Sequence, residues 1–171
     1  MLLNKVRAEN VMRSYGLEAL IATSTANVFY TSDINPYGIA FVLLPYERNI
    51  EPAVIASISG PTPIALSTPS WIKDMHFYGE FYTTTHFASE PLTDSERDLI
   101  KIQESWEKEK EKDPISILIR LLKERGLTKG KIGVDQSKLP LEHPFWHHIK
   151  KEIGEAPKKA DKSEIIKWIK N

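Results

Sequence analysis

The hydrophobic and polar positions of the first 32 residues predict a helix, a strand and a second helix, in that order. Apolar residues recur at helical spacing among charged ones over residues 2–15, and Gly16 stands where a helix commonly ends. Residues 17–23 form a compact apolar run with little alternation, which is typical of a strand covered on both faces. Ser24 follows as a candidate N-cap for a short helix that runs through Tyr30.

The middle of the chain predicts short strands. Four apolar runs are strand candidates: residues 39–44, 53–58, 64–66 and 75–78. The polar stretch 45–52 joins the first two and suits the turn of a hairpin. Gly79 closes the last candidate, and residues 80–91, rich in threonine and aromatic side chains, show no clear period. We interpret that last stretch as an irregular loop or an edge segment.

The second half of the chain predicts more helix than strand. The helical stretches are residues 94–106, 114–126, 139–153 and 161–171. The helix at 114–126 is the best defined, because Pro114 suits a first helical position and an apolar stripe runs on to Gly126. Residues 131–135 and 155–160 are extended candidates. This mixture of strands and helices indicates an α/β fold class in a single domain.

The composition fits one globular domain and excludes several function classes. The 171 residues are 41% hydrophobic and 27% charged, and 23 basic residues balance 23 acidic ones. A neutral chain has no general field that would attract nucleic acid or an anionic membrane. There is no cysteine, no apolar run of 18 residues and no signal-peptide core near the N-terminus. We therefore expect a cytoplasmic protein with no nucleic-acid or membrane partner.

The five histidines match no known metal or catalytic motif. Residues four apart share a helix face, as His143 and His147 would, and His148 is adjacent, but no carboxylate completes a set of ligands at a recognisable spacing. His76 and His86 lie in no nucleophile pattern, and the glycines form no phosphate-binding loop. The sequence thus predicts no catalytic residue and no metal site in this chain.

A polar and aromatic loop between a helix and a buried strand is the candidate recognition element. Loops in such positions often carry binding residues, and residues 30–38 form one here. A plain turn is an equally good interpretation, because Asp33, Asn35 and Pro36 are also common turn residues. Trp71, farther along the chain, suits either the core or an interface.

Several segments together resemble the N-terminal domain of the creatinase, prolidase and aminopeptidase P family. The resemblance runs through residues 7–12, 16–21 and 27–32, a strand ending at Pro45, residues 113–135 and residues 160–171. From Gly16 to Ser32 the chain follows the typical family phrase almost step by step, whereas Asp33 replaces the usual glycine. The order of these segments is more specific than any one of them.

The resemblance implies a fold and a site for the chain. It implies one domain over residues 1–171, with a mixed β-sheet flanked by helices in a ribonuclease H-like topology. In such proteins a C-terminal catalytic domain of the pita-bread type holds two divalent metal ions, and that domain would lie outside this chain. The resemblance also implies a homo-oligomer in which Asn35, Tyr37 and Trp71 help to shape the pocket for a proline-containing peptide in the neighbouring subunit.

The first hypothesis is therefore a non-catalytic domain of an Xaa-Pro dipeptidase or aminopeptidase P, which is inactive by itself. Two alternatives stay open. One is a stand-alone binding or dimerisation module, against which the abrupt end of the chain argues mildly. The other is the N-terminal domain of a creatinase-like amidinohydrolase, although residues 33–38 contain no arginine that could clamp a carboxylate.

Overall fold

A five-stranded mixed sheet forms the centre of the computed structural model, which describes residues 1–36, 38–58, 70–79, 91–97, 100–101, 111, 113–129 and 131–135. The strands lie in the order β4 (Asp74–Tyr78), β3 (Ala53–Ser57), β2 (Ala40–Pro45), β1 (Ala19–Ala22) and β5 (Ile132–Val134). The pairs β1–β2 and β2–β3 are antiparallel, whereas β1–β5 and β3–β4 are parallel. The predicted mixed α/β sheet is confirmed.

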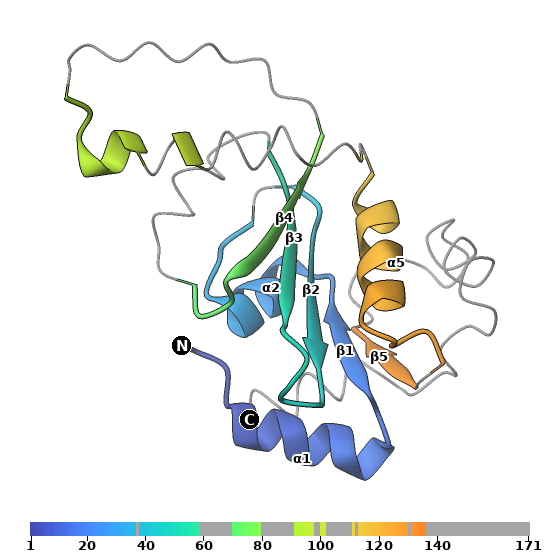
Figure 1. Cartoon of the computed structure of the whole chain (residues 1–171). Helices are drawn as coiled ribbons and strands as arrows, with labels where there is room; N and C mark the ends of the chain where they lie inside the picture. The colour runs from blue at the N-terminus through green and yellow to red at the C-terminus, as the bar shows by residue number, and fades with distance from the viewer. Residues whose placement is uncertain are drawn as a thin grey trace.

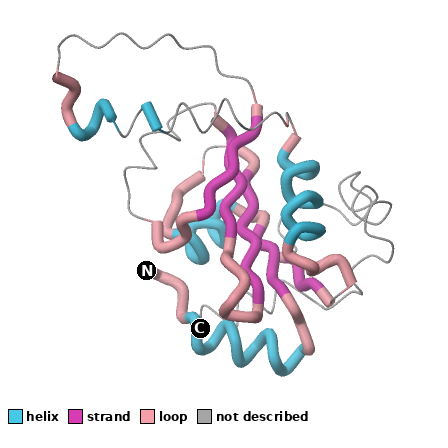
Figure 2. The backbone as a smooth tube through the Cα atoms, in the orientation of Figure 1, coloured by secondary structure: helices cyan, strands magenta, loops and turns pink. Residues whose placement is uncertain are grey.

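Helices pack on both faces of this sheet. Helix α5 (Pro114–Glu124) covers one face, where its side chains meet Ile21, Phe41, Leu43 and Ile55 in one buried cluster. Helix α2 (Thr25–Ser32) lies on the opposite face, and helix α1 (Lys5–Tyr15) crosses one end of the sheet (Figure 1). Figure 2 shows the helices beside the strands of the sheet. Because both faces are covered, the strands β1, β2 and β3 are buried at every position, as their apolar runs predicted.

Capping residues set the limits of α1. The side chain of Asn4 accepts a hydrogen bond from the backbone N–H of Arg7, so the helix begins at Lys5 rather than at residue 2. Gly16 has φ 62° in the left-handed region, and the next N–H, that of Leu17, donates to the carbonyl of Met12 at 2.8 Å. The predicted helix and its glycine cap are confirmed.

The central hairpin and the helix before β5 also follow the predictions. Strands β2 and β3 pair with Val42 opposite Val54, and residues 46–52 form the turn between them. Asp113 caps α5 by accepting from the N–H of Ser116 at 3.0 Å, and Pro114 takes the first helical position. The extended stretch predicted at 131–135 is strand β5, which pairs in parallel with β1.

Other predicted elements fall wholly or partly outside the described residues. The strand candidate at 64–66, almost all of residues 80–91, the helices at 139–153 and 161–171 and the extended piece at 155–160 are among them. Of the helix predicted at 94–106, the described residues 94–97, 100 and 101 are helical. Thr93 and Glu96 form a capping box at its start. Within the described part of the chain, no helix is long and apolar enough to cross a membrane.

Candidate functional site

The structure places Trp71 next to the end of α2. Its indole Nε1–H donates to the carbonyl of Thr31 at 2.9 Å, and the neighbouring Ser70 hydroxyl donates to the carbonyl of Ser32 at 2.7 Å. These bonds fix the segment before β4 on the last turn of α2. Asn35 lies just beyond that turn, after Asp33 and Ile34, and is exposed, so two of the predicted pocket residues come from adjoining segments. Tyr37 lies outside the described residues.

Asp33 stands where the resembling family usually has a glycine. It ends α2 in the left-handed conformation with φ 63°. An aspartate adopts this conformation more readily than most residues. Its carboxylate Oδ1 accepts from the backbone N–H of Leu2 at 2.7 Å, and the amine of Met1 lies 3.4 Å from Oδ2. The loop that follows α2 is therefore held against the first residues of the chain.

A buried carboxylate joins two distant segments that carry the resemblance seen in the sequence. Asp135 follows β5 and is 2% exposed. Its two oxygens accept five hydrogen bonds of 2.5–2.9 Å from the N–H and hydroxyl groups of Thr23 and Ser24 and from the side-chain amide of Asn27. We call these four residues the Asp135 node. Its acceptor sites are used by the fold itself, which makes this aspartate a structural group rather than a catalytic one.

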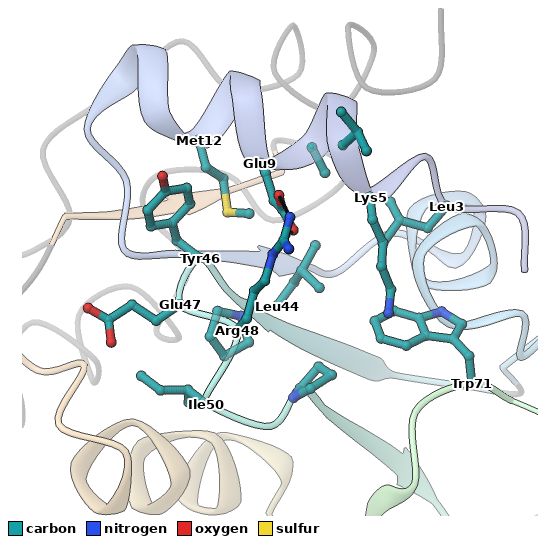
Figure 3. Close-up of a pocket in the computed structure, with 14 residues that line it drawn as sticks. Leu3, Lys5, Glu9, Met12, Leu44, Tyr46, Glu47, Arg48, Ile50 and Trp71 are labelled. Atoms are coloured by element: carbon teal, nitrogen blue, oxygen red, sulfur yellow. Dashed lines mark hydrogen bonds and ion pairs between the residues drawn. The ribbon is translucent and has the colours of Figure 1, made fainter.

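A groove of about 420 Å³ opens between α1 and the turn that joins β2 to β3 (Figure 3). We call it the α1 groove. Its apolar lining comes from α1 and the residues before it, from the β2–β3 hairpin and from Trp71: Leu3, Val6, Ala8, Met12, Leu44, Pro45, Ile50, Pro52 and Trp71. Charged and polar lining residues are Lys5, Glu9, Tyr46, Glu47 and Arg48. Such a mixture of apolar surface and a few polar groups is typical of a binding site.

Charged side chains bridge the two walls of the α1 groove. Arg48 donates from Nε and Nη2 to the two carboxylate oxygens of Glu9 at 3.1 and 2.7 Å. This hydrogen bond lowers the pKa of Glu9. Arg13 donates to the hydroxyl of Tyr46 at 3.0 Å, and that bond raises the pKa of the guanidinium. At the other end, the ammonium of Lys5 lies 3.8 Å from the centre of the Trp71 ring.

His76 is a strand residue, as the sequence suggested, and it lies in a charged cluster at the edge of the sheet. Its Nε2 is 3.0 Å from Oδ1 of Asp74, and Arg125, at the end of α5, donates to Oδ2 of the same carboxylate. The contact with His76 is the main cause that lowers the pKa of Asp74. The cluster joins β4 to α5.

Within the described residues, no group of three or more histidine, aspartate or glutamate side chains is arranged to hold a metal ion. His86, His143, His147 and His148 lie outside those residues.

Comparison with known proteins identifies the fold. No family model matches the sequence, and no curated protein matches it. Solved structures do match. The prolidase of Pyrococcus horikoshii OT3 aligns over 95% of this chain with a TM-score of 0.53 at 16% identity. An Xaa-Pro aminopeptidase structure from Streptococcus pyogenes aligns over 96% with a TM-score of 0.59 at 15% identity, and one from Streptococcus thermophilus over 97% with 0.54 at 15%.

The chain has the creatinase/prolidase N-terminal fold. It spans 33% of the length of the Pyrococcus prolidase, and 93% and 94% of the two streptococcal structures. The resemblance noted in the sequence is therefore confirmed for the fold.

The α1 groove of this creatinase/prolidase N-terminal fold was not predicted from the sequence. Glu9 and Arg48 are 39 residues apart, and no pattern in the sequence links them. Lys5 and Trp71 meet across an even longer stretch of chain. Only the position of α1 over the end of the sheet brings these side chains together. The Asp135 node could have been suspected from the sequence, because its four residues lie in the segments that carry the family resemblance.

Proposed function

We propose that this chain serves as the non-catalytic N-terminal domain of an Xaa-Pro peptidase of the prolidase or aminopeptidase P type. The supporting observation is the creatinase/prolidase N-terminal fold, which covers 95% of this chain but 33% of the Pyrococcus prolidase. A companion C-terminal domain would then hold the two divalent metal ions and carry out metal-assisted attack of water on the peptide bond. The assembly would work in the cytoplasm.

The proposed role of this domain is to shape the substrate pocket and to form the oligomer. Asn35, Tyr37 and Trp71 would face a proline-containing peptide in the pocket of the neighbouring subunit. Support comes from the bonds that hold the Trp71 segment on the end of α2, close to the exposed Asn35. A rigid platform of this kind suits recognition of the stiff Xaa-Pro bond.

Two measurements on the purified chain test the proposal. A panel of Xaa-Pro dipeptides and longer Xaa-Pro peptides should show no hydrolysis, with or without Mn²⁺ or Co²⁺, because the metal site belongs to the companion domain. Light scattering after size-exclusion chromatography should give the mass of a dimer. Metal-dependent turnover would contradict the non-catalytic role, and a monomer at every concentration would contradict the role in assembly.

A further inference from the structure

A second hollow adjoins the α1 groove near the C-terminal end of α1. Its volume is about 390 Å³, within the range of roughly 300–1,000 Å³ that small-molecule sites occupy. We call it the Arg13 pocket, and its lining residues are Glu9, Arg13, Tyr46, Glu47, Arg48 and Asn49. None of the residues proposed for the peptide pocket is among them. An inference about the Arg13 pocket is therefore independent of the proposed peptidase role.

Backbone bonds hold both walls of the Arg13 pocket. One wall is the last turn of α1, which carries Arg13. The other is the turn between β2 and β3. There the N–H of Tyr46 donates to the carbonyl of Glu18 at 2.7 Å, and the N–H of Ile50 donates to the carbonyl of Glu47 at 3.1 Å. The polar side chains thus extend from a helix end and a closed turn, which fixes their starting points.

The Arg13 pocket keeps hydrogen-bond donors that the fold does not use. Arg13 donates through Nε to the hydroxyl of Tyr46 at 3.0 Å, and Arg48 donates through Nε and Nη2 to Glu9. Within the described part of the chain, the Nη groups of Arg13, the Nη1 group of Arg48 and the hydroxyl proton of Tyr46 have no acceptor. Donors from three side chains therefore remain for a ligand.

Positive charge is in excess around these donors. The bond from Arg48 lowers the pKa of Glu9, and the charges of Arg13 and Lys5 act in the same direction. One carboxylate thus faces three cations. The other acidic lining residue, Glu47, extends away from the guanidinium of Arg48 (Figure 3). Glu9 alone therefore does not neutralise this part of the surface.

The two guanidiniums also repel one another. The bond with Tyr46 is the main cause that raises the pKa of Arg13, whereas the charge of Arg48 acts against it. An anion between two cations removes such repulsion. The Arg48 side chain is 80% exposed, so water already competes for its pair with Glu9, and an incoming anion can do the same.

We propose that the Arg13 pocket binds the phosphate group of a small phosphate monoester. A phosphate has three terminal oxygens and can meet both guanidiniums and the Tyr46 hydroxyl at once, whereas a carboxylate has two oxygens. The rest of the ligand would lie toward Asn49 and the solvent. A nucleic acid is not the expected ligand, because the chain has no net positive charge.

The test titrates phenyl phosphate into the ¹⁵N-labelled 171-residue chain at pH 7 and constant ionic strength. The reporters are the Nε–H signals of Arg13 and Arg48, assigned by Arg13→Gln and Arg48→Gln. Benzoate is the matched probe, with the same ring and a carboxylate in place of the phosphate. We expect saturable shifts of both signals with phenyl phosphate, and binding about fivefold weaker for benzoate.

Three variants separate a built site from general attraction between charges. Arg13→Gln, at an exposed position of α1, should weaken the binding of phenyl phosphate about tenfold. Tyr46→Phe removes a donor without changing the charge and should weaken it about threefold. Arg7→Gln is the matched control, because it makes the same change of charge on the same helix outside the pocket. It should bind as the unmodified chain does.

Four results would overturn the proposal. Equal binding of benzoate and phenyl phosphate would remove the preference for phosphate, and an equal loss in Arg7→Gln and Arg13→Gln would indicate attraction to charge alone. Unchanged binding in Tyr46→Phe would mean that the hydroxyl does not contact the ligand. The absence of any saturable shift would mean that the pocket does not bind a phosphate group.

Discussion

At the scale of single residues, Asp135 connects two distant parts of the sequence. Its bonds to Thr23 and Ser24 cross 112 and 111 positions of the chain. They tie the end of β5 to the end of β1 and to the first turn of α2. Asp135, Thr23 and Ser24 therefore serve the fold rather than catalysis.

Replacing Asp135 with alanine should destabilise the chain by about 3 kcal/mol, because several buried donors lose a charged acceptor at once. Asp135→Asn should lose less, since one oxygen still accepts while the new amide faces other donors. Urea unfolding followed by circular dichroism measures both changes. As a control, Asp94→Ala removes a carboxylate that is 94% exposed and should have little effect. Equal effects of the Asp135→Ala and Asp94→Ala substitutions would refute the structural role of the node.

At the same scale, the candidate site could be predicted only in part. The exposed position of Asn35 follows from its place among turn residues. The contacts of Trp71 were not predictable, because its partner is a backbone carbonyl 40 residues earlier in the chain. No local pattern encodes such a bond. Asp33 was recognisable as a departure, but its contact with the N–H of Leu2 required the fold.

At the scale of elements, helices and strands were predictable where local chemistry sets their limits. Gly16 and Pro114 mark a helix end and a helix start through backbone conformation alone. The pairing of β5 with β1 was not readable in this way. It depends on close approach, since a side chain at Gly133 would come within 2.6 Å of a Leu20 methyl group. The sequence shows Gly133, but it does not show that Leu20 packs against it.

The Asp74 cluster, which joins β4 to α5, should make the fold sensitive to acid. The pKa of Asp74 is lower in the folded chain than the value of about 3.9 of an unfolded one. Its contribution is therefore complete above about pH 4 and is lost as the pH falls through the folded-state pKa. Urea unfolding at pH 7, 5, 4 and 3 should show a smaller loss of stability below pH 4 in Asp74→Asn than in the unmodified chain.

The matched control for the acid experiment is Asp94→Asn, at an exposed aspartate of the helical turn 94–97. Its stability should follow the pH curve of the unmodified chain. If Asp74→Asn also follows that curve, the bonds from His76 and Arg125 do not contribute to the acid response, and other carboxylates determine it.

At the scale of the whole molecule, the two halves of the chain complete one another. The first half builds β1 to β4 and the helices α1 and α2, whereas α5 and β5 come from the second half. One face of the sheet depends on α5 for its cover, because Ile21, Phe41, Leu43 and Ile55 pack against Ile117, Leu118 and Leu122. All seven side chains are at most 2% exposed.

A fragment of residues 1–79 should therefore not fold, although it contains four of the five strands. Without α5 and β5, its sheet would leave an apolar face in water and the donors around Thr23 without Asp135. We expect strong binding of the dye ANS, weak near-ultraviolet circular dichroism and no cooperative urea transition, while the 171-residue chain shows a sharp transition. A fragment that unfolds cooperatively and binds no dye would mean that α1, α2 and four strands are a sufficient core. The second half would then add to a finished fold, and the Asp135 node would join two units that fold separately.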